Sequence, residues 1–312
     1  MYEGMRVEQS VHRHLLIGLQ GTTLSAWEMQ MLRESPPRGV ILFARNTASP
    51  EQVKALLDDV RQTTGKAIWA AIDEEGGRVN RMPWAPFHPR RPACDYGRMM
   101  VDDASAALQA VYEDNLLVGK ALQELGFTHN CAPVLDLFHA EGHGIIGERA
   151  YGSDVMTVAR LASACWKGLR DGGVSAVGKH FPGHGRANAD SHVAVPLVDA
   201  PLDILLREAQ TFARMIEAGI EHVMTAHVVY PQADENVATL SPFWLAEVLR
   251  KRFGFSGCIW SDDLSMKGAG SDVLMTTKVA LDAGCDVLPI CEPADVRRIY
   301  EAFPDGVLGL GI

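Results

Sequence analysis

The chain has 312 residues and a formal net charge of −10, and 47% of its residues are hydrophobic. This length fits two ordinary domains or one large barrel, and the hydrophobic content is sufficient for a sizeable buried core. The acidic balance and the lack of any basic run exclude an ordinary nucleic-acid-binding groove, which needs clustered Lys and Arg.

Short apolar segments alternate with helical patterns along nearly the whole chain. Each segment has the length and the Val, Ile and Leu content of a buried strand. Eight such strands are predicted, at residues 14–21, 39–46, 67–73, 128–136, 175–182, 222–230, 257–263 and 285–291.

Amphipathic helices are predicted between most of these strands. Ser49 and Pro50 predict the start of one helix, because serine caps helices and proline suits the first turn. A second helix is predicted to begin near Ser153-Asp154 and to end at Gly172-Gly173. A third is predicted from about Pro201 to Ala218.

The alternation of strands and helices predicts a parallel α/β fold. Eight units without a Ser/Gly-rich linker favour a single-domain (β/α)8 barrel of the TIM type over residues 1–312. A doubly wound sheet is the alternative, but the chain lacks a GxGxxG turn after its first predicted strand.

Charged or imidazole side chains stand at the C-terminal ends of several predicted strands. In a barrel these ends converge on the face that carries the active site. A single Asp in such a place is often only a turn former or a helix cap. Stability does not require so many of them at one end, and we therefore expect a site there. The residues are Asp73, Asp136, Lys179, His180, His227, Asp262 and Asp263.

The stretch KHFPGHGRANADSH, residues 179–192, concentrates titratable groups on a predicted loop. Four of its residues could ligate zinc or another divalent ion: His180, His184, Asp190 and His192. Lys179 and Arg186 oppose a metal electrostatically, and the spacing matches no standard zinc pattern. The alternative is an acid/base apparatus, which we favour, and we expect neither a metal nor another cofactor.

Several motifs in order resemble those of glycoside hydrolase family 3: IDEEGGRVNR, NCAPVLD, GERAYGSD, KHFPGHGRANADSH, VMTAHVVYP, ATLSP and IWSDDLSMKGA. The closest resemblance is to its single-domain bacterial β-N-acetylglucosaminidases (β-hexosaminidases) of peptidoglycan recycling, and it covers most of the chain. The chain has DEEGG where the family more often has DQEGG, and VATLS in place of PATLS. The stretch WAPFHPRRPACDYG also departs from the usual pattern, which can alter the substrate rim.

The resemblance implies a catalytic set of Asp262 as nucleophile, His192 as acid/base and Asp190 as the partner of His192. Retaining glycosidases need a carboxylate nucleophile and a proton donor. An imidazole titrates near neutral pH, and a neighbouring carboxylate can fix its tautomer. Strand alternation alone does not choose between Asp262 and Asp263.

The resemblance also implies sugar-binding residues, whose charged hydrogen bonds would hold hydroxyl groups. They are Asp73, Arg81, Arg149, Lys179 and His180. Asp136 and His184 are expected to support loop structure, and Arg78 to form a surface or structural ion pair. Met224 and His227 either line the pocket or pack beneath it.

The implied activity is that of a retaining exo-β-N-acetylglucosaminidase acting on muropeptides such as GlcNAc–anhydro-MurNAc peptides. The alternatives are a β-glucosidase or β-xylosidase of the same family, a metal-dependent hydrolase and a non-catalytic sugar-binding barrel. Phosphorolysis in place of hydrolysis also stays open.

The chain lacks a signal-like start, a long apolar segment and CxxC pairs among its six cysteines. We therefore expect a cytoplasmic monomer with reduced, mostly buried thiols and with no nucleic-acid or membrane partner.

Overall fold

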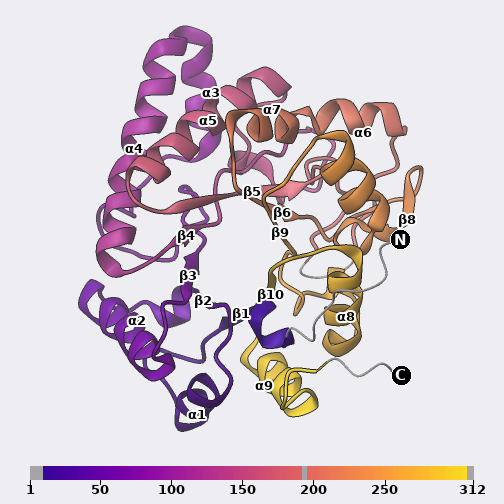
Figure 1. Cartoon of the computed structure of the whole chain (residues 1–312). Helices are drawn as coiled ribbons and strands as arrows, with labels where there is room; N and C mark the ends of the chain where they lie inside the picture. Colours follow the sequence, from indigo (N-terminus) through magenta and orange to yellow (C-terminus); the bar gives the residue numbers. More distant parts are fainter. Residues whose placement is uncertain (1–9, 192–194, 308–312) are drawn as a thin grey trace.

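The computed structural model describes residues 10–191 and 195–307. Its main sheet has eight parallel strands in the order β10-β1-β2-β3-β4-β5-β6-β9, and an isolated parallel bridge between Trp260 and Val287 joins its two edges. Figure 1 shows the strands as a ring with the helices outside it. The predicted (β/α)8 barrel is therefore confirmed. The strands are β1 (Leu15–Gly18), β2 (Gly39–Leu42), β3 (Trp69–Ile72), β4 (His129–Asn130), β5 (Ser175–Phe181), β6 (His222–Thr225), β9 (Cys258–Trp260) and β10 (Leu288–Ile290).

The outer layer consists mainly of α-helices. They are α1 (Ala26–Glu34), α2 (Pro50–Thr64), α3 (Ala93–Asp102), α4 (Ala104–Leu125), α5 (Val155–Asp171), α6 (Leu202–Glu208), α7 (Gln210–Ala218), α8 (Val273–Ala283) and α9 (Pro293–Ala302). A π-type helix, η5 (Phe243–Arg252), adds to this layer. Short 3₁₀ turns are η1 (Val11–His14), η2 (Ala44–Asn46), η3 (Gly147–Arg149), η4 (Ala238–Leu240) and η6 (Lys267–Ala269). No helix in the described part of the chain is both long and apolar enough to cross a membrane.

The helix ends follow the capping chemistry of the sequence in two of the three predicted cases. Ser49 Oγ accepts a hydrogen bond from the backbone of α2, and Asp154 caps α5 in the same way. The third predicted helix is divided into α6 and α7 by Ala209, whose ψ of −4° departs from the helical value near −42°. The break was not predicted because position 209 carries neither Gly nor Pro.

Several strands are shorter than predicted, because the chain leaves the sheet before the predicted segment ends. In the 128–136 segment only His129–Asn130 form a strand, and an isolated bridge between Val134 and Lys179 follows. Pro133, between them, has no N–H to donate to a neighbouring strand. The 222–230 segment divides into β6 and β7 (Val229–Tyr230), and β7 pairs with β8 (Asp234–Val237) outside the barrel. The released residues form the loops at the carboxyl end of the barrel.

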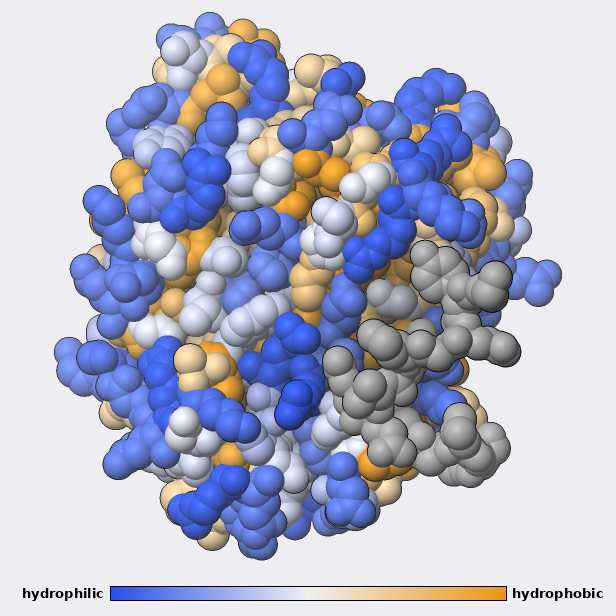
Figure 2. All heavy atoms as spheres, in the orientation of Figure 1, coloured by the Kyte–Doolittle hydropathy of each residue, from blue (hydrophilic) through white to orange (hydrophobic). Residues whose placement is uncertain are grey.

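Two hydrophobic layers hold these elements together. The larger one lies between the strands and the helices, while a smaller one fills the barrel interior with side chains such as Leu16, Val177 and Trp260. Successive residues of a strand point into opposite layers: on β1, Leu16 lies in the interior layer and Ile17 in the layer under the helices. The face seen in Figure 2 is mainly hydrophilic, with apolar residues in small separate groups. All six cysteines are free thiols, and four of them are buried. The packed interior closes the floor of the barrel and leaves its carboxyl end for a site.

Candidate active site

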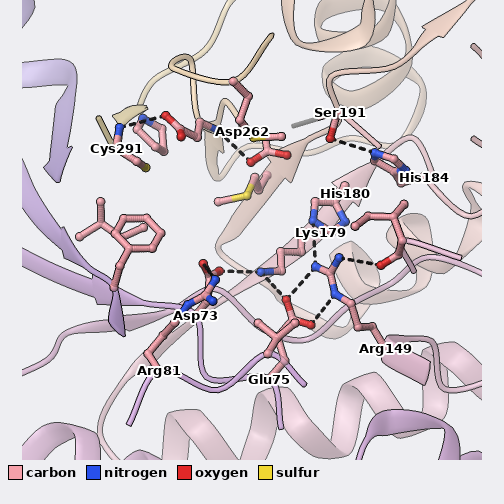
Figure 3. Close-up of a pocket in the computed structure, with 18 of the residues that line it drawn as sticks. Asp73, Glu75, Arg81, Arg149, Lys179, His180, His184, Ser191, Asp262 and Cys291 are labelled. Atoms are coloured by element: carbon pink, nitrogen blue, oxygen red, sulfur yellow. Dashed lines mark hydrogen bonds and ion pairs between the residues drawn. The ribbon is translucent and has the colours of Figure 1, made fainter. Parts of the chain in front are cut away.

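A cavity of about 250 Å³ lies at the carboxyl ends of the barrel strands. Its lining includes six of the eight predicted site residues: Asp73, Arg81, Arg149, Lys179, His180 and Asp262. These residues come from segments far apart in the sequence, and their side chains converge in Figure 3. Of the other two, Asp190 does not line the cavity, and His192 lies outside the described residues.

Lys179 lies at the centre of the charged half of the cavity. Its Nζ atom donates to Asp73 Oδ1 and to Glu75 Oε1, both at 2.7 Å. Asp73 Oδ2 also accepts from Arg81 Nη2 at 3.0 Å. Glu75 forms a two-point contact with Arg149, whose Nε and Nη2 atoms each donate to one of its oxygens at 2.8 Å. Two carboxylates and three cations therefore form one continuous network.

Burial and pairing act in opposite directions on the pKa values of this network. Burial alone would raise the pKa of Asp73, but the charges of Lys179 and Arg81 outweigh it and hold the pKa well below its usual range. Arg149 and Lys179 similarly lower the pKa of Glu75 to about 2. The pKa of Lys179 is raised, because its carboxylate partners outweigh its burial. All three groups are thus charged at neutral pH.

Glu75 is a site residue that the sequence reasoning missed. It belongs to the acidic run DEEGG after β3, in which only Asp73 was predicted to bind substrate. The available signal was the run itself, because three successive carboxylates at a barrel mouth need cations nearby. The sequence could not show that Lys179 and Arg149 would supply them.

Asp136 organises the loop that follows β5. Its Oδ2 atom contacts His180 Nδ1 at 2.7 Å, and Oδ1 accepts from the backbone N–H of His184 at 2.7 Å. Burial opposes ionisation of Asp136, yet the two imidazoles and these hydrogen bonds lower its pKa. The His180 Nδ1–H therefore points to Asp136, and Nε2 lies 3.4 Å from Arg149 Nη2 in the cavity. The supporting role expected for Asp136 agrees with this geometry.

Asp262 and Asp263 follow β9 and line the cavity, but they are held differently. Asp263 Oδ1 accepts from the backbone N–H groups of Ser265 and Cys291, each at 2.9 Å, and so closes a turn. Asp262 Oδ1 accepts the N–H of Asp263 at 2.8 Å, and no other described residue hydrogen-bonds to this carboxylate. Figure 3 shows Asp262 across the cavity from the Lys179 network. The geometry favours Asp262 over Asp263 as the reactive carboxylate, a choice that the strand pattern left open.

The electrostatic surroundings of Asp262 keep it ionised. Burial would raise its pKa, but the imidazoles of His227 and His180 and the N–H of Asp263 lower it. His227 is buried below the cavity, where its ring contacts the Asp263 carbonyl and Thr239 Oγ1, each at 2.9 Å. Met224, by contrast, lines the cavity. Of the two residues expected either to line the pocket or to pack beneath it, Met224 lines it and His227 packs against its wall.

The loop after β5 brings Ser191 into the cavity wall. Ser191 Oγ lies 3.3 Å from His184 Nε2, and the Ser191 carbonyl accepts from Gly268 N at 2.9 Å. Asp190 is partly exposed. His184 lines the cavity, beyond the loop-supporting role expected of it, and burial lowers its pKa to about 4. The residue directly before His192 is therefore in the same cavity as Asp262.

Two expectations about the surroundings of the site need correction. Among the described lining residues, none comes from the 84–97 stretch that was expected to alter the substrate rim. That stretch packs behind the DEEGG turn, where Arg90 donates to the Glu74 carbonyl at 3.2 Å. Arg78 does lie at the cavity, and its guanidinium donates to the carbonyls of Gly144 and Ile145 instead of to a carboxylate.

The part of the chain that the structure describes does not contain the ligand set that a metal-dependent hydrolase would need. Within residues 10–191 and 195–307, no group of three or more His, Cys, Asp or Glu side chains is arranged to hold a metal ion. His180 and His184 are close, with ring centroids 5.7 Å apart, but Asp136 contacts Nδ1 of His180 and Ser191 contacts Nε2 of His184. These contacts indicate hydrogen-bonding roles for both imidazoles.

Comparison with known proteins gives consistent results along nearly the whole chain. Residues 16–308 match the glycosyl hydrolase family 3 N terminal domain. A protein of Methylobacillus flagellatus named beta-hexosaminidase is 40% identical over 90% of this chain and 81% of its own length. A protein of Xylella fastidiosa strain M12 with the same name is 39% identical over 95% of this chain and 91% of its own length. The crystal structure of NagZ from Neisseria gonorrhoeae in complex with N-trifluoroacetyl-D-glucosamine has a TM-score of 0.86 and 35% identity, covering 93% of this chain and 85% of NagZ.

Proposed function

This chain belongs to glycosyl hydrolase family 3, and we propose that it is a retaining exo-β-N-acetylglucosaminidase that releases terminal β-linked GlcNAc from muropeptides. The beta-hexosaminidase relatives and the NagZ structure with a glucosamine derivative support the sugar specificity. The observation that carries the proposal is the cavity itself, in which an ionised Asp262 faces a network of charged hydrogen-bonding groups. Its floor is closed by the barrel core, which favours binding of a terminal sugar.

The proposed reaction has two steps. In the first, the Asp262 carboxylate attacks the anomeric carbon while His192 donates a proton to the departing oxygen. In the second, His192 takes a proton from water, which attacks the glycosyl-aspartate ester and restores the original configuration. Asp190 would orient the imidazole and stabilise its charged form. The position of Ser191 in the cavity wall supports this assignment of its neighbours.

The charged network is proposed to hold the hydroxyl groups of the terminal sugar. Asp73, Arg81, Lys179, Arg149 and His180 are each fixed by a partner before any sugar binds. A preorganised arrangement avoids the cost of ordering long side chains on binding. Contacts made away from the reacting carbon can then help to bring the sugar ring toward its transition state.

The first test compares p-nitrophenyl glycosides of GlcNAc and glucose with the wild-type protein. We expect kcat/KM to favour the GlcNAc derivative by a factor of about 10², because a site that bonds the amide loses those bonds with glucose. Equal or reversed preference would instead favour the β-glucosidase alternative.

Rates with and without added phosphate distinguish hydrolysis from phosphorolysis, and we expect phosphate to leave the rate unchanged. The proposed cellular role, recycling of cell-wall fragments by a cytoplasmic monomer, needs a separate assay on GlcNAc–anhydro-MurNAc peptides.

A second test concerns His192. Replacing it with alanine removes the proposed proton donor, so substrates with poor leaving groups should lose activity most. We expect kcat to fall by about 10³-fold on a natural disaccharide and by much less on a p-nitrophenyl glycoside, whose leaving group departs without protonation. Measured kcat values on both substrates check this. Equal losses on both would contradict the acid/base assignment.

A further inference from the structure

Glu74 lies between two residues of the charged network but does not line the cavity. Its side chain is completely buried. Oε1 accepts from the backbone N–H groups of Arg81 and Met82, at 2.7 and 2.9 Å, and Oε2 accepts from Asn80 Nδ2 at 2.9 Å. One carboxylate therefore receives three hydrogen bonds from the far end of the turn that begins at Glu74.

This turn presents Arg81 to the cavity. The Glu74 carboxylate holds the Arg81 N–H, Thr47 Oγ1 donates to the Arg81 carbonyl at 2.7 Å, and the guanidinium reaches Asp73 at 3.0 Å. Among the residues that the structure describes, none forms a hydrogen bond with the buried Arg81 Nε atom. The direction of the guanidinium therefore depends on its contact with Asp73 and on how the turn is held.

The charged groups that act on Glu74 come from its own segment and from the stretch that follows it. Asp73, Glu75 and Arg81 belong to its own segment, and Arg90 reaches it from the following stretch. β4 contributes the neutral Asn130 and α4 the neutral Asn115, the latter through Arg90. Burial raises the pKa of Glu74 to about 7, although the N–H of Arg81 and the charge of Arg90 act in the opposite direction.

We propose that Glu74 is a positioning residue for Arg81, and that its carboxylate form holds the Arg81 turn more firmly than its protonated form. The carboxylate can accept all three hydrogen bonds. The protonated acid must place an O–H on one oxygen, and a proton on Oε2 would face the Asn80 amide, which is itself a donor. The proposal rests on the proposed function, because that function makes Arg81 part of the sugar site.

The ionised form also has a cost for folding. A carboxyl group whose pKa is about 7 in the native state and ordinarily 4.5 binds more protons in the native than in the unfolded state between these values. The free energy of unfolding therefore falls as pH rises through this window and stays lowered above it. Glu74 thus improves the site above neutral pH while reducing stability there.

The test is the substitution Glu74→Gln, which keeps the size of the side chain and one acceptor oxygen but cannot ionise. The measured quantity is the ratio of the variant KM to the wild-type KM at each pH, on an aryl glycoside that the wild type hydrolyses. Groups that titrate in both proteins affect both KM values and cancel in this ratio. We expect a ratio of about one at about pH 5 and about fivefold at about pH 8, as when a charge-assisted hydrogen bond is replaced by a neutral one. Melting temperatures should agree at the lower pH and be higher for the variant at the upper one.

Glu28→Gln is the matched control. Glu28 is another buried glutamate that accepts two backbone N–H groups, from Gln20 and Ser25, but it lies in the capping box of α1 away from the cavity. Its KM ratio should stay near one at both pH values. A purely structural role of Glu74 predicts the same flat ratio for Glu74→Gln, and that result would overturn the proposal.

The two proposals fail in different ways. Absence of wild-type turnover on every aryl glycoside would refute the proposed function. Normal wild-type turnover with a flat Glu74→Gln ratio would refute only the role of Glu74. A crystal structure of Glu74→Leu, which has no acceptor, needs no turnover at all: we expect Arg81 to leave Asp73, and retention of that contact would overturn the positioning role.

Discussion

Replacing Asp262 with asparagine is expected to reduce kcat by about 10⁶-fold, the scale seen when a hydrolase loses its nucleophile. The amide cannot form the glycosyl ester, but it has nearly the same shape as the carboxylate. Its oxygen can still accept the Asp263 N–H that Asp262 accepts at 2.8 Å. The melting temperature should fall slightly at neutral pH, because the interactions that lower the pKa of this carboxylate outweigh its burial and are lost in the amide. Steady-state kinetics on p-nitrophenyl GlcNAc and a melting curve measure both effects.

Asp263→Asn is the control for this prediction. The Asp263 oxygen that closes the turn accepts two backbone N–H groups, and an amide oxygen can do the same. We expect kcat to stay within about tenfold of the wild type, with some loss of stability from the changed turn. Mass spectrometry of a trapped glycosyl-enzyme should locate the sugar on Asp262. Trapping on Asp263, or a greater kcat loss in its variant, would reverse the assignment.

The barrel could be predicted because strand and helix patterns alternate without interruption. What the pattern could not give was the exact length of each strand. Phe43 and Ala44 continue the apolar run of β2 in the sequence, yet β2 ends at Leu42 and the 3₁₀ turn η2 begins at Ala44. There, Asn46 Oδ1 accepts the Phe43 N–H, and Asn46 Nδ2 donates to the Leu19 carbonyl. Such side-chain contacts between distant segments end a strand without leaving a periodic signal.

The cavity could be predicted in part for a similar reason. Asp73 and Asp262 follow strands and Lys179 lies near the end of β5, and barrel geometry brings such positions together. The pairing of Glu75 with Arg149 joins residues 74 positions apart, through a loop with no regular pattern. Glu74 was missed because its role is to hold backbone groups, and nothing in an acidic run distinguishes a buried carboxyl from one that faces substrate.

The residues proposed to bind the sugar are paired with one another in the structure without substrate, and this pairing has an energetic consequence. Lys179 is almost fully buried and balances Asp73 and Glu75, so each ion lowers the cost of burying the others. A sugar hydroxyl that enters the cavity adds hydrogen bonds to ions that are already fixed. Stability and binding therefore depend on the same cation.

Replacing Lys179 with methionine should destabilise the protein by about 3–5 kcal/mol at neutral pH, since Asp73 and Glu75 both lose their shared buried partner and each keeps one arginine. The loss should shrink on acidification. Lys179 lowers the pKa values of Asp73 and Glu75, so its contribution is present above their ordinary values near 4 and is lost as pH falls through the lowered ones. In the variant both pKa values rise and the acids become neutral sooner. Urea unfolding at about pH 7 and about pH 4 measures the difference.

Lys54→Met provides the matched control, because Lys54 forms an exposed ion pair with Asp58 at 3.1 Å on α2. Such a pair contributes about 0.5 kcal/mol or less, so the control should unfold almost as the wild type does. Adding Glu75→Gln to Lys179→Met removes the carboxylate that Arg149 contacts at two points, so the double variant should be less stable than Lys179→Met. Equal losses for the two lysine variants, or a Lys179→Met deficit that is the same at both pH values, would show that the buried cation does not balance these carboxylates.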